Sequence, residues 1–373
     1  MVETSITKLL RHSVYLSIKE GDADQFTRLA SNISDWDGLI QASEATGLSN
    51  ILYSHLKACS IPIPENQVVQ FIALAARHTR SNRDRISALT EILDEFDKRG
   101  IRCILLKGMA LLHSLYDEKS QRPMGDMDIL VGHQSADDAQ QVLRDLGYNA
   151  GKRKHGYLFD HHHLPLASKN FKGLSLQVEI HHDALSGDAP GSITFESAID
   201  RAQPVSVDGR KTSVLGAQDT LFHLSNHTFE PIENIKLGSL SDIYGYAVRY
   251  KLQIPWNDKS TKQSRINNTL RCLHYLSPLP NSLREIPELS IPRADPPSGV
   301  GKGFIPLSVT MNPRNSFSKK FSNLFLCSEW WMRVQYIVPP EKSLVWTRYI
   351  THPCRILFWF FRRLRAKLKS KLS

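Results

Sequence analysis

The stretch "RPMGDMDILV" at residues 122–131 decides the fold, because it sets two carboxylates one residue apart directly before an apolar run. Alternate residues of a β-strand share a face, so Asp126 and Asp128 are predicted to project together while Met127 and Ile129 point to the opposite layer. Two like charges in such proximity repel each other unless a cation lies between them. The stretch therefore predicts a strand that holds a cation at its edge.

The segments around this stretch are predicted to follow the order helix, strand, helix, strand, helix. In residues 82–100, apolar side chains recur at three- and four-residue steps, with Ser81 or Asn82 able to cap the start and Gly100 able to end the helix. Residues 135–147 repeat the pattern, with their first serine as the cap and their last glycine as the stop.

Four short apolar segments are predicted strands, namely 101–106, 127–131, 161–167 and 174–183. In the last of these, apolar and polar residues alternate, so Glu179 and His181 are expected to share its open face. An Asp-Gly turn at 208–209 predicts a hairpin further on. The pattern indicates an α/β (α+β) protein with helical regions on both sides of a strand-bearing core.

Composition divides the chain of 373 residues into five parts. They are a helical N-terminal region at 1–82, a core at 83–210, a helical region at 211–276, a Pro/Gly-rich loop or linker at 277–318, and C-terminal helices with a basic tail at 319–373. Five scattered cysteines form no C-x-x-C pair, and the N-terminus lacks the apolar core of a signal peptide. A cytoplasmic protein is expected.

The net charge of +10 is concentrated at the end of the chain, where residues 351–373 carry seven Lys and Arg and no acid. Together with neighbouring aromatic residues, this tail predicts peripheral contact with an anionic membrane surface. The alternative is that its apolar residues dock on the body while the lysines stay in water; those residues are Leu357, Phe360, Phe361, Leu364 and Leu368. No sequence motif indicates a specific nucleic-acid partner.

The carboxylates suggest a site for Mg²⁺ or Mn²⁺, because these cations prefer oxygen ligands. Asp126 and Asp128, joined by Glu179 from a neighbouring strand, are the predicted metal ligands and catalytic residues, provided that the two strands pair. Phosphate is expected beside them. The residues predicted to bind it are Lys107 and Gly108 at the turn from strand to helix, Arg122, and Gly125.

Three blocks carry a resemblance: "ILLKGMALLHSLY" (104–116), "RPMGDMDILV" (122–131) and "LQVEIHHD" (176–183). They resemble the conserved blocks of the uncharacterised bacterial nucleotidyltransferase family within the polymerase-beta-like superfamily. The likeness covers most of the chain from about Asp84. Later segments that also resemble the family's helices are 218–230, 241–256 and 349–365.

The resemblance implies a small mixed sheet flanked by helices, with metal bound by Asp126 and Asp128. It implies that Glu179 helps to activate an acceptor hydroxyl, and that a nucleoside monophosphate passes from an NTP to that hydroxyl with release of pyrophosphate. Where the superfamily turn is usually glycine-serine, this sequence has Lys107-Gly108. The acceptor, which is a small molecule, a peptide or a protein, is not identified by the sequence.

Two other functions are compatible with the same residues. One is a nucleotide-binding or scaffold protein that keeps the fold without the chemistry, and the other is an AMPylating enzyme that modifies a protein hydroxyl. The histidines offer a further alternative, because His161, His163 and His181 can form a zinc site. Otherwise His181 is expected to orient Glu179 or to contact phosphate, and His223 and His227 are expected to pack in a helix.

Overall fold

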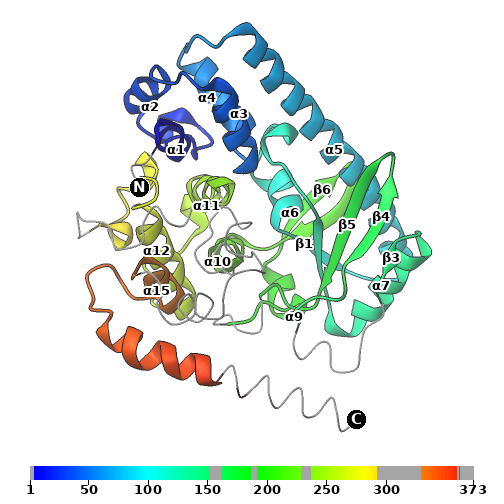
Figure 1. The fold of residues 1–373 in the computed structure, drawn as a ribbon. Coiled ribbons are helices and arrows are strands. Elements are labelled where there is room, and N and C mark those ends of the chain that lie inside the picture. The colour runs from blue at the N-terminus through cyan, green and yellow to red at the C-terminus, as the bar shows by residue number, and fades with distance from the viewer. Residues whose placement is uncertain are drawn as a thin grey trace.

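The computed structural model describes residues 4–151, 161–185, 191–227, 237–291, 329–358 and 361. Its centre is a seven-stranded mixed sheet with helices on both faces, and further helices extend to one side of the sheet (Figure 1). The predicted fold class is confirmed.

Strands β1, β2 and β5 form the middle of the sheet, in the order β3-β4-β5-β2-β1-β7-β6. The strands are β1 Cys103–Leu106, β2 Met127–Val131, β3 Asn149–Ala150, β4 Ala167–Phe171, β5 Leu174–His181, β6 Gln203–Val207 and β7 Arg210–Val214. Strand β2 runs parallel to β5 and antiparallel to β1, and β1 runs parallel to β7. The sheet is therefore mixed, as the resemblance implies.

One predicted strand is wrong in position. Residues 161–166 form only an isolated bridge, between His163 and His181, and β4 begins at Ala167. Pro165 has no N–H to donate to a ladder, which explains why pairing starts after it. The predicted hairpin is confirmed, with Asp208 and Gly209 both in the left-handed region (φ 44° and 86°) that a tight two-residue turn requires.

The helices before the sheet are α1 Ser5–Arg11, α2 Ala23–Ala30, α3 Trp36–Ala45, α4 Ser49–Ala58 and α5 Glu65–Lys98. Helix α5 begins 17 residues before the predicted cap Asn82, so the capping role expected of Ser81 or Asn82 is wrong. The predicted division of the chain between 82 and 83 falls inside this helix. Val69 and Ile72 of α5 are exposed. The first turns of this helix therefore lack the one-sided apolar pattern by which an amphipathic helix is recognised in a sequence.

The remaining helices are α6 Lys107–Ser114, α7 Ala136–Asp145, α9 Phe195–Ala198, α10 Ala217–His227, α11 Leu237–Arg249, α12 Thr261–Leu273 and α15 Glu329–Tyr336. Ser135 lies at the N-cap of α7 as expected, but it also ends a short 3₁₀ turn and its side chain makes no capping hydrogen bond. The predicted stops are confirmed, because Gly100 and Gly147 follow their helices with φ of 66° and 84°.

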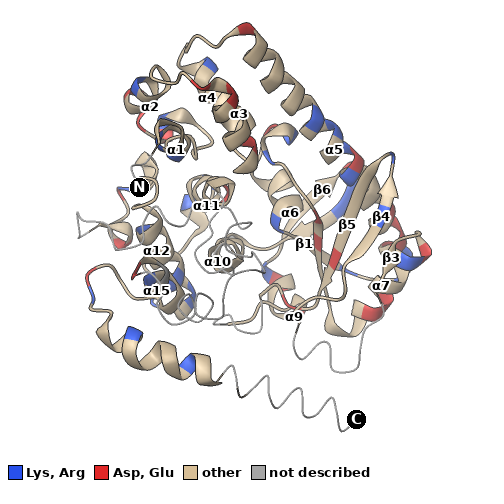
Figure 2. Ribbon diagram, viewed as in Figure 1, with Lys and Arg blue, Asp and Glu red and all other residues tan. Residues whose placement is uncertain are grey.

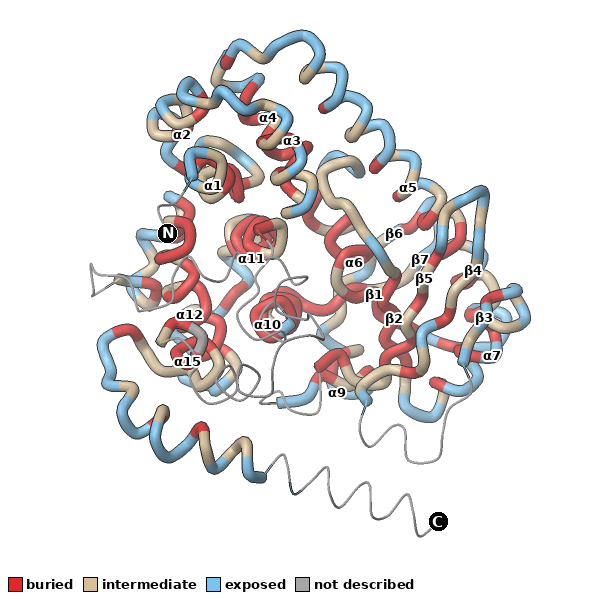
Figure 3. The backbone as a smooth tube through the Cα atoms, in the orientation of Figure 1, coloured by how far each residue is buried: buried red, intermediate tan, exposed pale blue. Residues whose placement is uncertain are grey.

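Each face of the sheet belongs to a separate apolar cluster. Figure 3 shows that the central strands are largely buried. Leu105, Ile129 and Ile180 pack on one face against α7 and the second half of α5. Ile104 and Leu130 pack on the other face, in a cluster that includes α10, α11, α12 and the N-terminal helices. The helical regions before and after the sheet therefore share one core.

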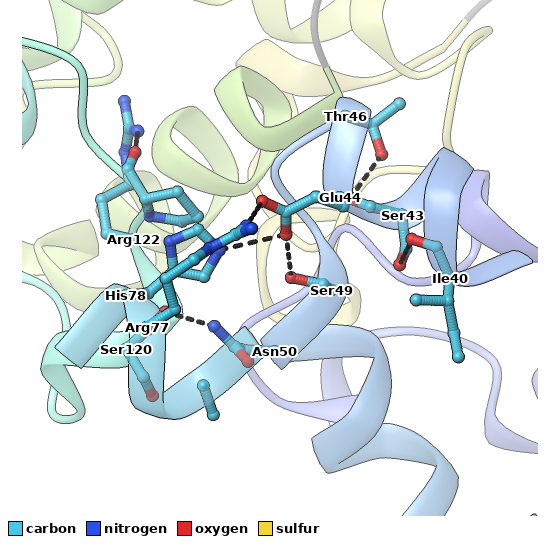
Figure 4. Close-up of polar contacts among 12 residues, drawn as sticks. Ile40, Ser43, Glu44, Thr46, Ser49, Asn50, Arg77, His78, Ser120 and Arg122 are labelled. Carbon is cyan, nitrogen blue, oxygen red and sulfur yellow. Dashed lines mark hydrogen bonds and ion pairs between the residues drawn. The ribbon is translucent and has the colours of Figure 1, made fainter. Parts of the chain in front are cut away.

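Polar contacts tie the N-terminal helices to α5 and to the loop before β2 (Figure 4). The carboxylate of Glu44 on α3 lies 3.0 Å from the His78 imidazole of α5 and accepts a 3.0 Å hydrogen bond from Ser49 of α4. Burial disfavours the ionised carboxylate, but the His78 contact outweighs it and lowers the pKa of Glu44. Asn50 of α4 donates to the carbonyl of Ser120, in the loop that leads to Asp126.

His55 on α4 is expected to make stability depend on pH. It is 2% exposed and packs edge-on against Phe26, and burial lowers the pKa of its imidazole to about 4. The unfolded chain has an ordinary pKa of about 6.5, so this stabilisation is complete above that pH and is lost as pH falls toward 4. When the pH is lowered from about 7.5 to about 5, we expect the free energy of unfolding to decrease by about 2 kcal/mol because of His55.

Urea unfolding at the two pH values, on the natural chain and on His55→Leu, measures this effect. The substitution removes the titrating ring, so the difference between the two pH values should shrink by that amount. An unchanged pH difference in the variant contradicts the prediction, whatever the variant's absolute stability.

Much of two predicted parts of the chain lies outside the described residues, namely 292–318 of the loop or linker and 319–328, 359–360 and 362–373 of the C-terminal helices with the basic tail. The described part of the linker contains two short 3₁₀ turns, Asn281–Leu283 and Pro287–Leu289. Of the helices described, none is at once long and apolar enough to cross a bilayer.

Candidate active site

Strand register brings the predicted carboxylates together at the centre of the sheet. Asp128 of β2 lies opposite Glu179 of β5 and, on its other side, opposite Leu106 of β1. Register partners project to the same face, so the predicted pairing of these two acids is confirmed. Figure 2 shows acidic positions on the central strands at this place. Lys107 follows Leu106 directly and adds a cation.

Asp128 is almost completely buried, at 1% exposed. Its Oδ1 accepts a 2.8 Å hydrogen bond from Lys107 Nζ and lies 2.9 Å from His181 Nε2. Burial disfavours the charged form, but the Lys107 ammonium and the His181 contact outweigh it and hold the pKa of Asp128 well below its usual range. The protein thus keeps a carboxylate ionised in its interior.

His181 links Asp128 to Glu179, because its Nε2 also lies 3.5 Å from Glu179 Oε2. Burial alone would lower the pKa of this fully buried imidazole, but the contacts with Asp128 and Glu179 raise it. The same contact lowers the pKa of Glu179, which is 20% exposed. The open face expected for His181 is therefore wrong: His181 lies where helices cover this face of the sheet, whereas Glu179 is partly exposed.

The Lys107-Gly108 turn is tightly packed. Lys107 has φ 46°, a left-handed conformation that costs energy for a residue with a side chain. Burial opposes its charge, but Asp128 raises the pKa of the Lys107 ammonium. A Cβ atom at Gly108 would lie 2.9 Å from the side chain of Met124. The loop before Asp126 therefore packs directly on the start of α6.

Asp126 precedes β2 and lies at the margin of the site. Burial and the nearby charge of Asp128 raise the pKa of Asp126. Behind it, Arg85 of α5 donates to the carbonyl of Gly125 at 3.3 Å and is only 5% exposed. Gly125 itself is exposed, and a Cβ atom there would meet nothing within 4 Å. Its backbone is open to an approaching ligand.

The sequence did not point to the residues that hold this loop. Asn82 of α5 donates to the carbonyls of Lys119 and Arg122, at 2.6 and 2.9 Å. With Arg85, it fixes both ends of the approach to Asp126. Both residues appear in the sequence only as polar positions of an amphipathic helix, and no local pattern distinguishes them from solvated ones.

Arg122 is bound to a second carboxylate, on the far side of the loop. Its Nε donates to Oδ1 of Asp242 on α11 at 2.8 Å, and the Tyr116 hydroxyl donates to the same oxygen at 2.7 Å. The Asp242 side chain is 4% exposed. Contact of Arg122 with phosphate stays a prediction, while its role in joining α11 to the loop is visible in the structure.

A family model for an uncharacterised nucleotidyltransferase matches residues 32–279, which is more than half of the chain. The chain belongs to this nucleotidyltransferase family. The family match begins at residue 32, just before α3 and well before Asp84, where the resemblance was expected to start, and it includes the helices that hold the loop before β2. The resemblance seen at 349–365 lies beyond the matched residues.

Two solved structures are similar to this family member at low identity. The crystal structure of ANT(2'')-Ia in complex with adenylyl-2''-tobramycin is 12% identical, over 45% of this chain and 90% of that chain, with a TM-score of 0.32. An antigenic nucleotidyltransferase-like protein from Paracoccidioides brasiliensis is 14% identical, over 61% of this chain and 97% of that chain, with a TM-score of 0.36. No curated protein sequence matches the chain.

The histidines of this family member do not form the three-histidine zinc site among the residues described. The possible metal ligands that come within 4.8 Å of one another there are Asp128, Glu179 and His181. His163 instead has its Nδ1 2.8 Å from the carbonyl of Leu164. His223 of α10 is buried; burial holds its pKa well below the usual value, and the charges of Lys107 and His181 contribute to the shift. That helix therefore lies close to the site.

The donor set fits a divalent cation. Two ionised carboxylates and an imidazole nitrogen converge within 4.8 Å, although Asp126, a predicted ligand, is not part of this group. Oxygen ligands suit Mg²⁺, and a mixed set with imidazole also suits Mn²⁺. A cation bound there would supply positive charge and would acidify a hydroxyl group beside it. In the structure described, the Lys107 ammonium balances the charge of Asp128.

Proposed function

We propose that this protein is a metal-dependent nucleotidyltransferase, which moves a nucleoside monophosphate from an NTP to a hydroxyl acceptor and releases pyrophosphate. The observation that carries the proposal is the convergence of Asp128, Glu179 and His181 on one face of the sheet, next to the Lys107 ammonium. Membership of the family supports the same reaction class. A stable core has no need of a buried carboxylate held ionised at the sheet centre.

In this proposal the acidic residues have different roles, which follow from how exposed each one is. Asp128 and Glu179 would hold Mg²⁺ or Mn²⁺ with His181, and Asp126, at the margin of the site, would be a further ligand. Glu179 is partly exposed, and its lowered pKa keeps it ionised at neutral pH, so it accepts the proton of the acceptor hydroxyl. The alternative role for His181 is to orient Glu179 through the 3.5 Å contact.

We propose that the Lys107 ammonium leaves its contact with Asp128 and contacts the triphosphate when the nucleotide binds. Phosphate would approach the first N–H groups of α6, which have no partner within the helix. The exposed backbone of Gly125 borders the same space. Arg122 would add positive charge near the triphosphate while it stays hydrogen-bonded to Asp242.

Calorimetric titration with each of the four NTPs, with and without Mg²⁺ or Mn²⁺, tests the site. We expect one NTP to bind only when the metal is present. Transfer of label from an α-labelled NTP, with detection of pyrophosphate, tests the reaction, and the labelled product shows whether the acceptor is a small molecule, a peptide or a protein. Absence of metal-dependent binding to any NTP contradicts the proposal.

One observation favours the second candidate, a nucleotide-binding or scaffold protein without catalysis. Lys107 and His181 already satisfy Asp128, as partners do in a structural ion pair. The same experiment separates the two functions. Metal-dependent NTP binding with no pyrophosphate release across acceptor classes, including cell extract as a source of protein acceptors, favours the scaffold.

A further inference from the structure

The C-terminal helical segment, described at residues 345–358 and 361, exposes most of its apolar side chains to solvent. Of the eleven large hydrophobic side chains that are exposed in the described part of the chain, seven lie in this segment. They are Val345 (65%), Trp346 (71%), Tyr349 (69%), Ile350 (45%), Leu357 (54%), Phe358 (70%) and Phe361 (59%). Single exposed apolar residues are ordinary, but a concentration of them marks an interaction surface.

The segment contacts the body through its polar residues. The Nδ1 of His352, which is 3% exposed, lies 2.6 Å from the Tyr336 hydroxyl of α15, and the Arg355 guanidinium lies over the Tyr336 ring at 5.5 Å. Thr347 is also buried. A surface helix normally turns its apolar face inward, and this one turns that face outward. Figure 3 shows the segment largely exposed beyond α15.

The alternative in which the apolar residues dock on the body is wrong for the residues that the structure describes. Leu357 and Phe361 are both more than half exposed. The other three residues of that prediction, Phe360, Leu364 and Leu368, lie outside the described residues.

The charged residues of the chain from residue 345 onward are all positive. From residue 345 to the end of the sequence there are eight Lys and Arg and no Asp or Glu. Two of them, Arg348 and Arg355, lie within the helical segment. Apolar and aromatic side chains suit the boundary between lipid headgroups and acyl chains, and adjacent cations are attracted to anionic headgroups.

We propose that residues 345–361, with the basic residues that follow them, dock on the surface of an anionic lipid bilayer. A symmetric contact with a second copy would bring two such positive segments together, which their charge opposes. A duplex nucleic acid would neutralise the charge but leave the aromatic residues in water, because its base faces are already stacked. An anionic bilayer satisfies both features. The proposal is independent of the nucleotidyltransferase reaction.

Sedimentation of the full chain with lipid vesicles tests the proposal. We expect the partition coefficient to be at least about tenfold higher on phosphatidylcholine vesicles that contain phosphatidylserine than on phosphatidylcholine alone, and to fall as salt is added. The double variant Trp346→Ser, Phe358→Ser should lower binding to the anionic vesicles about tenfold or more.

The matched control is Val69→Ser with Leu252→Ser, which removes two other apolar side chains that are also more than half exposed (61% and 96%) and should leave binding unchanged. All four substitutions are at exposed sites, so each protein should keep its unfolding midpoint. Equal binding to both kinds of vesicle overturns the proposal, as does undiminished binding by the Trp346/Phe358 variant. Absence of vesicle binding, with self-association that this variant abolishes, also overturns it and assigns the face to a second copy.

Discussion

Asp128→Asn is expected to lower nucleotidyl transfer about a thousandfold, which corresponds to about 4 kcal/mol of transition-state stabilisation. The substitution keeps the shape of the side chain and removes the one charge that contacts both Lys107 and His181. Without it, Glu179 and the imidazole hold a divalent cation more weakly, and metal-dependent NTP binding should weaken as well. Pyrophosphate release and calorimetry on the same preparation measure the two losses.

Asp94→Asn is the matched control for this prediction. Asp94 also accepts 2.8 Å hydrogen bonds, from Arg210, but both side chains are more than 40% exposed, so its loss should leave transfer unchanged. Removal of the Asp128 charge leaves Lys107 in a buried site, so urea unfolding must first show that the variant is folded. Glu179→Gln tests the same loss of transfer activity at a less buried carboxylate. Full activity in both folded variants contradicts the proposed mechanism.

The middle of the sheet could be predicted from the sequence, because its information is local. Alternating apolar and polar residues in β5, and the apolar run of β2, identify both strands and the face that each residue takes. The pairing of Asp128 with Glu179 then follows once β2 and β5 are neighbours. Strand β4 was misplaced since its alternation is weak and Pro165 blocks the ladder just before it.

The support of the site could not be predicted, because it depends on contacts between distant segments. Arg85 and Asn82 lie about 40 residues before the loop that they hold. Asp242 meets Arg122 across 120 residues, and His223 approaches the site from α10. Each is a polar residue on a helix, and only the packing of that helix on the sheet shows which of its polar residues are buried.

The burial of His181 illustrates the same limit. Alternation along β5 correctly places its side chain on the face of Glu179, yet it cannot show that helices cover one end of that face. The difference is chemically important. An exposed histidine would titrate near its ordinary pKa, whereas the buried one is held between two carboxylates that raise its pKa.

Asp242→Ala is expected to lower the free energy of unfolding by about 3 kcal/mol, because it removes one partner of a buried ion pair. The Arg122 guanidinium, 25% exposed, would lose its counter-charge, and the Tyr116 hydroxyl would lose its acceptor. Partial exposure of Arg122 lets water replace some of the interaction, so the loss should be at the lower end for such pairs. Urea unfolding at neutral pH measures it.

Asp117→Ala is the matched control, because it breaks a second ion pair between α11 and the same loop. Asp117 lies 3.1 Å from Arg249, but its side chain is 86% exposed, so its removal should cost less than about 1 kcal/mol. Similar losses of unfolding free energy in the two variants contradict the claim that burial makes the Asp242 ion pair the more stabilising one. Since Arg122 begins the segment that carries Asp126, the Asp242 variant should also weaken metal-dependent NTP binding, whereas the Asp117 variant should not.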